Sequence, residues 1–309
     1  MIVFSGNSNP ALTSRICGYL DIPPGEAIVS TFSDGETRVE IKSNVRGRDV
    51  FIVQSTCSPA NHHIIEAVTM VDACRRASAD HITLVCPYFG YARQERGSLN
   101  RTPITAKLIA DILTTSGIDR LVVIDLHTSA IQGFFNIPVD HVFAKPVFEK
   151  HIESTKNLLI VSPDAGGASR ARMMAKHFNC GLAIVDKRRD TPNESSVMHI
   201  IGNVEGKECL IVDDICDTGG SLVKAADALM KNGAVSVSAA ITHAVLSGDA
   251  ISKIEESAIS RLIVTDTIPL SSKAKKCNKI VQLSVAELLS RAVRRIHAKQ
   301  SVTSLFLEI

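Results

Sequence analysis

The chain has 309 residues, of which 45% are hydrophobic, 21% are charged and 4% are aromatic. This length suggests about two domains of ~150 residues, and the apolar fraction supplies sizeable cores, which excludes a disordered protein or a disulfide scaffold. The formal net charge is +2, from 34 basic and 32 acidic residues, and tryptophan is absent. We therefore expect no nucleic-acid partner and no membrane partner, and any anion chemistry must come from locally placed charges.

The eight cysteines form no CxxC pair and no Cys/His cluster with the spacing of a zinc site. Most lie within apolar runs, where a thiol serves as a small buried side chain. No stretch reaches the ~18 apolar residues that a membrane span needs, and the N-terminus lacks the pattern of a signal peptide. We expect a cytoplasmic protein with reduced cysteines.

Short β-branched runs alternate with helix-length segments in both halves of the chain. The runs lie at 51–53, 82–85, 121–125, 158–161, 182–186, 210–213 and 262–266, and helical spacing occurs at 61–78, 104–116, 220–232 and 284–298. Pro103 suits a first helical turn, and Gly117 and Gly233 suit helix C-caps. Continuous apolar runs are typical of parallel strands covered on both faces. The pattern predicts an α/β fold with mostly parallel sheets flanked by helices.

The best domain boundary lies near Pro138 and Pro146, which interrupt the alternation of strands and helices. We expect domains at 1–145 and 146–309 with a cleft between them, and the last helix or tail could pack on the N-terminal domain. Several apolar runs end in Asp, or in Ser with Asp two residues later. Because ligands of open α/β sheets lie beyond the carboxyl ends of the strands, these carboxylates are expected at the site.

The most informative segment is 211–221, where an apolar run ends in Asp213 and Asp214 and a loop of small residues leads into a helix. The loop comprises Asp217, Thr218, Gly219, Gly220 and Ser221. Backbone N–H groups and hydroxyls at a helix N-terminus suit an anion, while carboxylates suit the hydroxyls of a sugar. The pattern predicts a sugar phosphate site. The alternative is an ordinary strand–turn–helix connection with helix caps.

This segment resembles the phosphoribosyl diphosphate (PRPP) loop shared by type I phosphoribosyltransferases and ribose-phosphate diphosphokinases. Other segments resemble the diphosphokinases, also called PRPP synthetases, in order and at that family's spacing: 32–36, 87–96, 125–135, 162–167, 186–189 and 264–270. The resemblance runs from Gly6 to the last residues. It implies two phosphoribosyltransferase-like domains, each with a mostly parallel sheet.

The resemblance also implies an activity: transfer of the diphosphoryl group of ATP to the C1 hydroxyl of ribose 5-phosphate, giving PRPP and AMP for nucleotide biosynthesis. It implies a homohexamer in which neighbouring subunits share the active site. In the family, the positions matching Arg93 and Gln94 bind ATP, together with a turn from the neighbouring subunit that matches Phe32, Asp34, Gly35 and Glu36. From the residues alone, both segments could equally be solvent-exposed loops.

Magnesium is the cofactor that the resemblance implies, with His127 and Asp164 as the metal-binding positions. A lone histidine is weak evidence by itself, since Mg²⁺ takes mostly oxygen ligands. Lys187 and Arg189 match the family's catalytic lid residues, and Arg189 also contacts ribose 5-phosphate there. Cations on a closing loop can stabilise the charge of a diphosphoryl-transfer transition state. The alternative is a solvated basic face.

The chain departs from the family pattern at Glu95, 97–99, Ala130 and Ser221. Phosphate activation and ADP inhibition rest on the resemblance alone, through positions matching Arg46, Arg76, Ser301, Thr303 and Phe306. Two other functions stay open at this point. One is a PRPP-consuming phosphoribosyltransferase, which would leave Arg93 and the 32–36 turn without a purpose. The other is a catalytically weak regulatory paralogue that co-assembles with a true synthetase.

Overall fold

The computed structural model describes residues 1–97, 101–188 and 197–305. Four of the positions named above lie outside these ranges: Ser98 and Leu99 in the departing segment, Arg189 of the lid and Phe306 of the regulatory set. The chain divides into two compact units. Of the described residues, unit 1 comprises Met1–Ala144, Thr267–Pro269 and 284–305, and unit 2 comprises Lys145–Asp266 and Leu270–Leu283.

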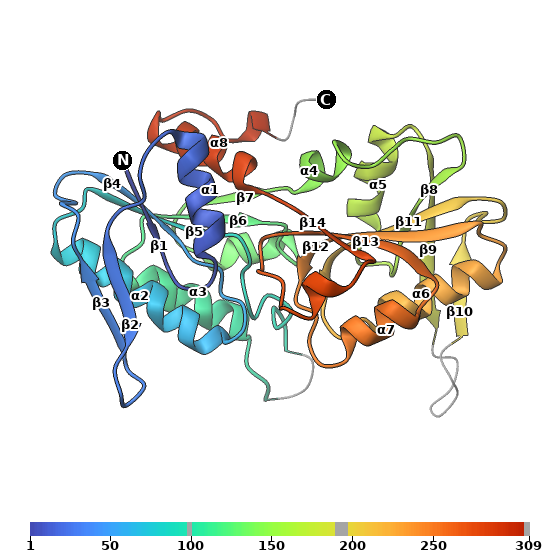
Figure 1. The fold of residues 1–309 in the computed structure, drawn as a ribbon, viewed down its shortest axis with the longest axis horizontal. Coiled ribbons are helices and arrows are strands. Elements are labelled where there is room, and N and C mark those ends of the chain that lie inside the picture. The colour runs from blue at the N-terminus through green and yellow to red at the C-terminus, as the bar shows by residue number, and fades with distance from the viewer. Residues whose placement is uncertain (98–100, 189–196, 306–309) are drawn as a thin grey trace. The chain divides into compact units, whose positions relative to one another are not determined.

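Unit 1 is built on a five-stranded parallel sheet (Figure 1). Its strands pair in the order β1 (Ile2–Ser5), β4 (Asp49–Val53), β5 (His81–Cys86), β6 (Arg120–Ile124) and β7 (Val139–Val142). Ile52 and Leu84 pack in a core with α2 (Ala60–Arg76) and α3 (Thr105–Ser116). Phe51 and Val85, which alternate with them, are also buried. Both faces of the sheet are therefore covered, which explains the continuous apolar runs.

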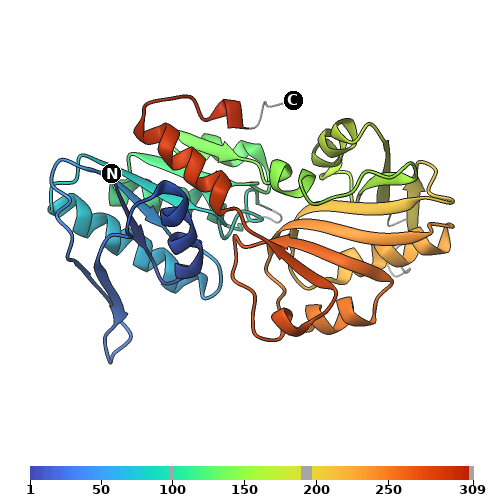
Figure 2. The same cartoon turned by 45° about the horizontal axis from the view of Figure 1, so that its top comes forward.

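The C-terminal helix returns to unit 1. Figures 1 and 2 both show α8 (Ala286–His297) beside α1 (Pro10–Leu20). A guanidinium nitrogen of Arg294 donates a hydrogen bond to the Tyr19 carbonyl oxygen at 2.8 Å, and His297 contacts Asp49 at the start of β4. The short helix η3 (Thr303–Leu305) follows. These contacts attach the end of the chain to the elements formed by its beginning.

An antiparallel hairpin projects from unit 1 in Figures 1 and 2. It consists of β2 (Ala27–Thr31) and β3 (Thr37–Ile41), which pair only with each other among the strands described. Val29 and Val39, the central pair of the hairpin, pack against the unit 1 core, so apolar contacts anchor the middle of the hairpin. At the tip, Gly35 has φ +96°, a conformation that glycine adopts without strain.

Unit 2 contains a seven-stranded sheet in the order β10 (Val197–Ile201), β9 (Gly181–Arg188), β8 (Leu158–Ser162), β11 (Glu208–Cys216), β12 (Ser236–Ala244), β13 (Ile259–Thr265) and β14 (Ile280–Leu283). All neighbours are parallel except β10 and β9. The helices of this unit are α4 (Lys145–Glu149), α5 (Ala168–His177), α6 (Gly220–Lys231), α7 (Ala250–Glu256) and the 3-10 helix η2 (Ala274–Lys276). Residues of α6 and α7 pack with the central strands in a second core.

The predicted α/β class with mostly parallel sheets is confirmed, and each expected run and helix has its counterpart. The expectation for Pro103 is wrong, because α3 begins at Thr105 with Ile104 as its N-cap. Gly117 does cap this helix, with φ +102°. Within the described ranges, no helix is both long enough and apolar enough to cross a membrane.

Candidate active site

Two neighbouring strands of unit 2 bring acidic side chains together. β8 and β11 pair in parallel, so the segments that continue from them lie at the same edge of the sheet. Asp164 follows β8, and Asp213 lies in β11 with Asp214 beside it. A Cβ atom added to Gly167 would be 3.7 Å from Oδ1 of both Asp164 and Asp213. The structure therefore brings two of the predicted site carboxylates, Asp164 and Asp213, together beside one glycine.

The turn after β8 fixes the Asp164 carboxylate. Its Oδ1 accepts a hydrogen bond from the Gly167 backbone N–H at 2.9 Å, and the Ser162 hydroxyl donates to the Asp164 carbonyl oxygen at 2.7 Å. A Cβ atom at Gly167 would lie only 2.8 Å from the Ser162 Oγ. The absence of a side chain at 167 thus lets this turn pack tightly and hold the carboxylate in place.

Arg170 is a site residue that the sequence analysis missed. It lies in the first turn of α5, and its Nη1 donates to Oδ1 of Asp213 at 3.2 Å and to Oδ1 of Asp214 at 3.1 Å. One guanidinium on α5 therefore bridges two carboxylates of β11. The only signal in the sequence is a basic residue soon after Gly166 and Gly167. That signal is weak, because the contact depends on which strand lies next to β8.

The acidic pair is electrostatically strained. Burial and the neighbouring charge of Asp214 raise the pKa of Asp213 from 3.8 to about 8, and the Arg170 guanidinium opposes this rise. The Asp213 Oδ1 also accepts the Asp214 backbone N–H at 2.9 Å. Two adjacent carboxylates in one partly buried site disfavour simultaneous ionisation. A ligand that donates hydrogen bonds to the pair, or a cation beside it, would relieve this cost.

The loop that follows runs into a helix, as expected. β11 extends to Cys216, so the expectation that the strand ends at Asp213 and Asp214 is wrong, and both carboxylates belong to the strand itself. Gly219 has φ +73° and forms the N-cap of α6, which begins at Gly220. Orphan backbone N–H groups at such a helix start favour a bound anion.

Residues around this loop differ in accessibility. Thr218 and Ser221 are exposed, whereas Gly219 is buried. The Asp217 side chain accepts a hydrogen bond from the Ser247 hydroxyl, and the Ser247 N–H donates to the Asp217 carbonyl oxygen at 3.0 Å. These bonds tie the loop to the segment after β12. The loop is therefore held open at the carboxyl edge of the sheet, with two hydroxyl-bearing residues facing solvent.

In unit 1, the predicted ATP loop and the predicted metal histidine lie on neighbouring loops. Arg93 and Gln94 are exposed after β5. The Gln94 Oε1 accepts a hydrogen bond from the Thr105 hydroxyl at 2.6 Å, which ties it to the start of α3. The Thr128 hydroxyl donates to the Glu95 carboxylate, and Thr128 immediately follows the exposed His127. The two loops thus meet at the carboxyl ends of β5 and β6.

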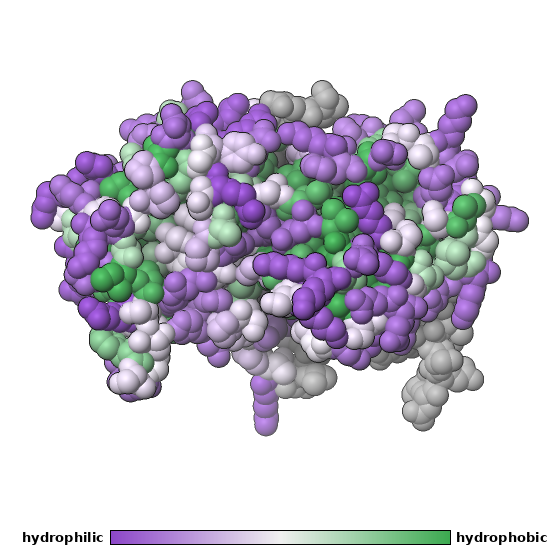
Figure 3. Space-filling view, viewed as in Figure 1, coloured by the Kyte–Doolittle hydropathy of each residue, from purple (hydrophilic) through white to green (hydrophobic). Residues whose placement is uncertain are grey.

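The hairpin turn presents its side chains to solvent. Phe32 is 50% exposed, and the Arg38 guanidinium lies 5.9 Å from its ring centroid. The Asp34 Oδ1 accepts the Glu36 N–H at 3.1 Å, and the Glu36 carbonyl oxygen accepts the Phe32 N–H at 2.8 Å. In the space-filling view of Figure 3, the hairpin at the lower left projects from the rest of unit 1. An exposed aromatic ring beside two carboxylates is suited to contact a partner surface or a base.

The two lid residues are located only in part. β9 continues to Arg188, and the backbone of Lys187 pairs with Met198 of β10. The expectation that this strand ends at Asp186 is therefore wrong. Arg189 and the residues that follow it, 190–196, lie outside the described residues.

Comparisons with known proteins give a consistent relationship. A model of the N-terminal domain of ribose phosphate pyrophosphokinase matches residues 1–117, and a model of the phosphoribosyl synthetase-associated domain matches residues 185–307. The ribose-phosphate pyrophosphokinase of Rhizobium meliloti (strain 1021) is 52% identical over 99% of this chain and 100% of that protein. The enzyme of the same name from Nitrosomonas europaea is 52% identical over 100% of this chain and 98% of its own length.

A crystal structure of phosphoribosylpyrophosphate synthetase from Mycobacterium smegmatis has the same fold. It superposes with a TM-score of 0.90 at 36% sequence identity, and the match covers 96% of this chain and 99% of that chain. Domain models, full-length relatives and a solved structure therefore agree. The chain belongs to the ribose-phosphate pyrophosphokinase family.

Proposed function

We propose that this enzyme transfers the diphosphoryl group of ATP to the C1 hydroxyl of ribose 5-phosphate, which gives PRPP and AMP for nucleotide biosynthesis. The observation that carries the proposal is 52% identity to ribose-phosphate pyrophosphokinases over essentially the whole length of both chains. The C1 hydroxyl oxygen bonds to the β-phosphorus of ATP, the bond from that phosphorus to the α–β bridging oxygen breaks, and the hydroxyl proton is released. No observation favours a regulatory paralogue.

The sugar phosphate would bind in unit 2. Asp213 and Asp214 would accept hydrogen bonds from ribose hydroxyls, and the 5-phosphate would bind at the start of α6. The helix N-terminus and Gly219 with its left-handed backbone support this placement, because they direct N–H groups toward an anion. The phosphate-binding residues would be Asp217, Thr218, Gly219, Gly220 and Ser221. Arg170 keeps the two carboxylates side by side.

ATP would bind at the loops of unit 1. Arg93 offers a planar fork of donors for the triphosphate, and Gln94 a neutral hydrogen-bonding edge. Adenine would be held by the hairpin turn of a neighbouring subunit, with Phe32 stacked on the base and Asp34 and Glu36 at its polar edge. The exposure of this turn supports the assignment.

Mg²⁺ fits the donor set of this chain. The carboxylates of Asp164 and Asp213 lie beside Gly167, and Arg170 bridges Asp213 to Asp214. Carboxylate oxygens are ligands of the kind that Mg²⁺ prefers. The family pattern assigns metal binding to Asp164 in unit 2 and to His127 in unit 1. When bound, Mg²⁺ would neutralise phosphate charge and orient the transferred group.

Lys187 and Arg189 would stabilise the charge that develops as the diphosphoryl group moves, and Arg189 would also contact ribose 5-phosphate. Positioned cations act strongly in such a site once water is excluded. Because these residues act on the transition state, their loss should lower turnover more than substrate affinity.

The assembly and its regulation are part of the same proposal. We propose a cytoplasmic homohexamer whose active sites are shared between subunits, with neither nucleic acid nor membrane as a partner. Its domains would be 1–145 and 146–309, with the last helix of the second domain packed on the first. Phosphate would activate and ADP would inhibit through Arg46, Arg76, Ser301, Thr303 and Phe306. These assignments follow the family pattern at the matching positions.

The direct test is formation of AMP from ATP by the purified protein. AMP should form only when ribose 5-phosphate and Mg²⁺ are both present, and the Lys187→Ala protein serves as the inactive control. AMP formation without ribose 5-phosphate, or its absence with both substrates and Mg²⁺ supplied, would contradict the proposal.

A further inference from the structure

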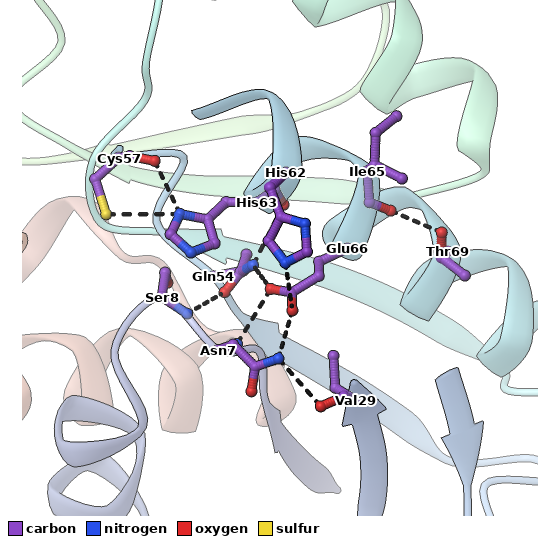
Figure 4. Close-up of polar contacts among 10 residues, drawn as sticks. All are labelled: Asn7, Ser8, Val29, Gln54, Cys57, His62, His63, Ile65, Glu66 and Thr69. Carbon is purple, nitrogen blue, oxygen red and sulfur yellow. Dashed lines mark hydrogen bonds and ion pairs between the residues drawn. The ribbon is translucent and has the colours of Figure 1, made fainter. Parts of the chain in front are cut away.

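A buried carboxylate in unit 1 is surrounded by donors from three segments (Figure 4). Glu66 lies in α2, and its side chain is 0% exposed. Its Oε2 accepts hydrogen bonds from Gln54 Nε2 at 2.6 Å and from the Asn7 backbone N–H at 3.3 Å. Its Oε1 accepts from Asn7 Nδ2 and lies 3.5 Å from His62 Nε2. Neither oxygen is left without a neighbour.

The contacts require a group that accepts at both oxygens. Asn7 and Gln54 approach Glu66 only through N–H groups. The Gln54 side chain and the Asn7 backbone donate to Oε2, and the Asn7 side chain donates to Oε1. An ionised carboxylate accepts at both positions, whereas a glutamine would place an NH₂ donor against one of these donors. Since the group is fully buried, water cannot easily replace the lost bond. Glutamine at this position would therefore break the cluster while keeping its shape.

The side-chain amide of Gln54 cannot rotate by 180° to offer its oxygen to a glutamine at position 66. Its Oε1 accepts the Ser8 backbone N–H at 3.0 Å, and its Nε2 donates to the His63 carbonyl oxygen at 3.3 Å. A Cβ atom at Gly6 would lie 2.2 Å from the Gln54 Oε1, so the glycine gives this side chain its room. The orientation of Gln54 is thus set by contacts on both ends, and Glu66 is the acceptor that matches it.

The cluster reaches the hairpin through Asn7. The same Asn7 Nδ2 that contacts Glu66 donates to the Val29 carbonyl oxygen at 3.1 Å. Val29 is the central residue of β2, three residues before Phe32. Figure 4 shows Asn7 between Glu66 and the β2 backbone. The chain of contacts from α2 to β2 therefore ends close to the turn that carries Phe32, Asp34 and Glu36.

We propose that Glu66 is a positioning residue that orients Asn7 and thereby holds the hairpin in the arrangement that presents its turn to ATP. The inference rests on the proposed role of that turn in adenine binding. It concerns a side chain that contacts no substrate and that acts through Asn7. Apolar contacts of Val29 and Val39 hold the middle of the hairpin against the core, while the Asn7 bond determines where the β2 backbone lies.

The consequence is a selective loss of ATP affinity. If only a fraction of the hairpins is correctly placed, the apparent dissociation constant for ATP equals the intrinsic constant divided by that fraction. Removing hydrogen bonds to a buried charged group should reduce this fraction about tenfold or more. The Michaelis constant for ribose 5-phosphate should change less than twofold, because its proposed site is built from unit 2.

The experiment compares four variants of the full-length enzyme. Glu66→Gln removes the acceptor, and Asn7→Ala removes the link to Val29 at an exposed residue, so it should fold even if the first variant does not. Ile64→Val is the matched control, because Ile64 is a buried core residue of α2 outside the cluster. Phe32→Ala tests the turn itself. Steady-state constants for both substrates and deuterium uptake by residues 27–41 are measured for each.

We expect Glu66→Gln and Asn7→Ala to raise the Michaelis constant for ATP about tenfold or more and to speed deuterium uptake in the hairpin, while Ile64→Val does neither. Unchanged uptake in both variants, or equal effects on both substrates, would overturn the inference. If Phe32→Ala leaves the ATP constant unchanged, the proposed role of the turn fails instead, and faster uptake would still support the anchor itself.

Discussion

Asp213→Asn should make the substrate-free protein more stable at alkaline pH while abolishing efficient catalysis. Folding raises the pKa of Asp213 from 3.8 to about 8, through burial first and the charge of Asp214 second. A carboxyl group with a raised pKa contributes full stability below pH 3.8, and this contribution is lost as the pH rises to about 8. Asparagine is neutral at every pH, so the variant does not lose folding stability in this way as the pH rises.

The magnitude follows from linkage. Each unit of raised pKa corresponds to about 1.4 kcal/mol. The rise from 3.8 to about 8 therefore costs about 6 kcal/mol of folding free energy once the pH exceeds about 8. Asparagine also weakens the bond from Arg170, a charge-assisted contact worth about 1.5–3 kcal/mol. The net gain is about 3–4 kcal/mol, which corresponds to roughly 6–16 °C in melting temperature.

The assay is thermal unfolding at several pH values without Mg²⁺ or ribose 5-phosphate. The stability difference between the variant and the wild type should grow between pH 4 and pH 8 and then stay constant. Asp249→Asn is the matched control, because a hydrogen bond from Lys253 lowers the pKa of that exposed aspartate, so its replacement should not stabilise. A gain that is equal at every pH, or a loss of stability at pH 8.5, would refute the electrostatic reasoning.

Three further predictions concern catalysis. Lys187→Ala should fold normally and lower turnover at least a hundredfold with small changes in the Michaelis constants, because several kcal/mol of transition-state stabilisation are lost. A turnover within about tenfold of wild type would contradict this role. Asp214→Asn should raise the Michaelis constant for ribose 5-phosphate more than that for ATP, and an equal effect in steady-state assays would point to misfolding or metal binding. Oligomers that mix Phe32→Ala and Lys187→Ala chains should regain activity, because some sites then combine an intact turn with an intact lid; verified mixed oligomers without activity would argue against sites shared between subunits.

Local sequence patterns were sufficient where burial decides the structure. The runs at 82–85 and 121–125 became β5 and β6, because both faces of these strands are covered. The apolar runs noted in the sequence do not include β2 and β3, because the residues of these strands are partly buried or exposed and their pairing depends on the turn between them. The strand at 210–213 was expected to end early because Asp213 and Asp214 are polar. Its backbone pairing with β12 nevertheless continues to Cys216, since backbone hydrogen bonds do not depend on an apolar side chain.

The candidate site was predicted where several site residues are close in sequence, and missed where contacts join distant segments. The loop 217–221 combines glycines, hydroxyls and a helix start in one stretch, so it could be recognised directly. Arg170 and Glu66 could not, because their partners lie 43 and 59 residues away in the chain. A buried glutamate in an otherwise amphipathic helix gives no local sign of which donors surround it.

The central claim is that the diphosphoryl group of ATP moves as one unit to the C1 oxygen of ribose 5-phosphate, and phosphorus NMR of the reaction mixture tests it most directly. With ATP, ribose 5-phosphate and Mg²⁺, the account predicts one AMP for each ATP consumed, together with a diphosphate whose inner phosphorus is coupled to the C1 proton of the sugar. Formation of ADP with a singly phosphorylated C1, or of AMP with unattached inorganic diphosphate, would contradict the account.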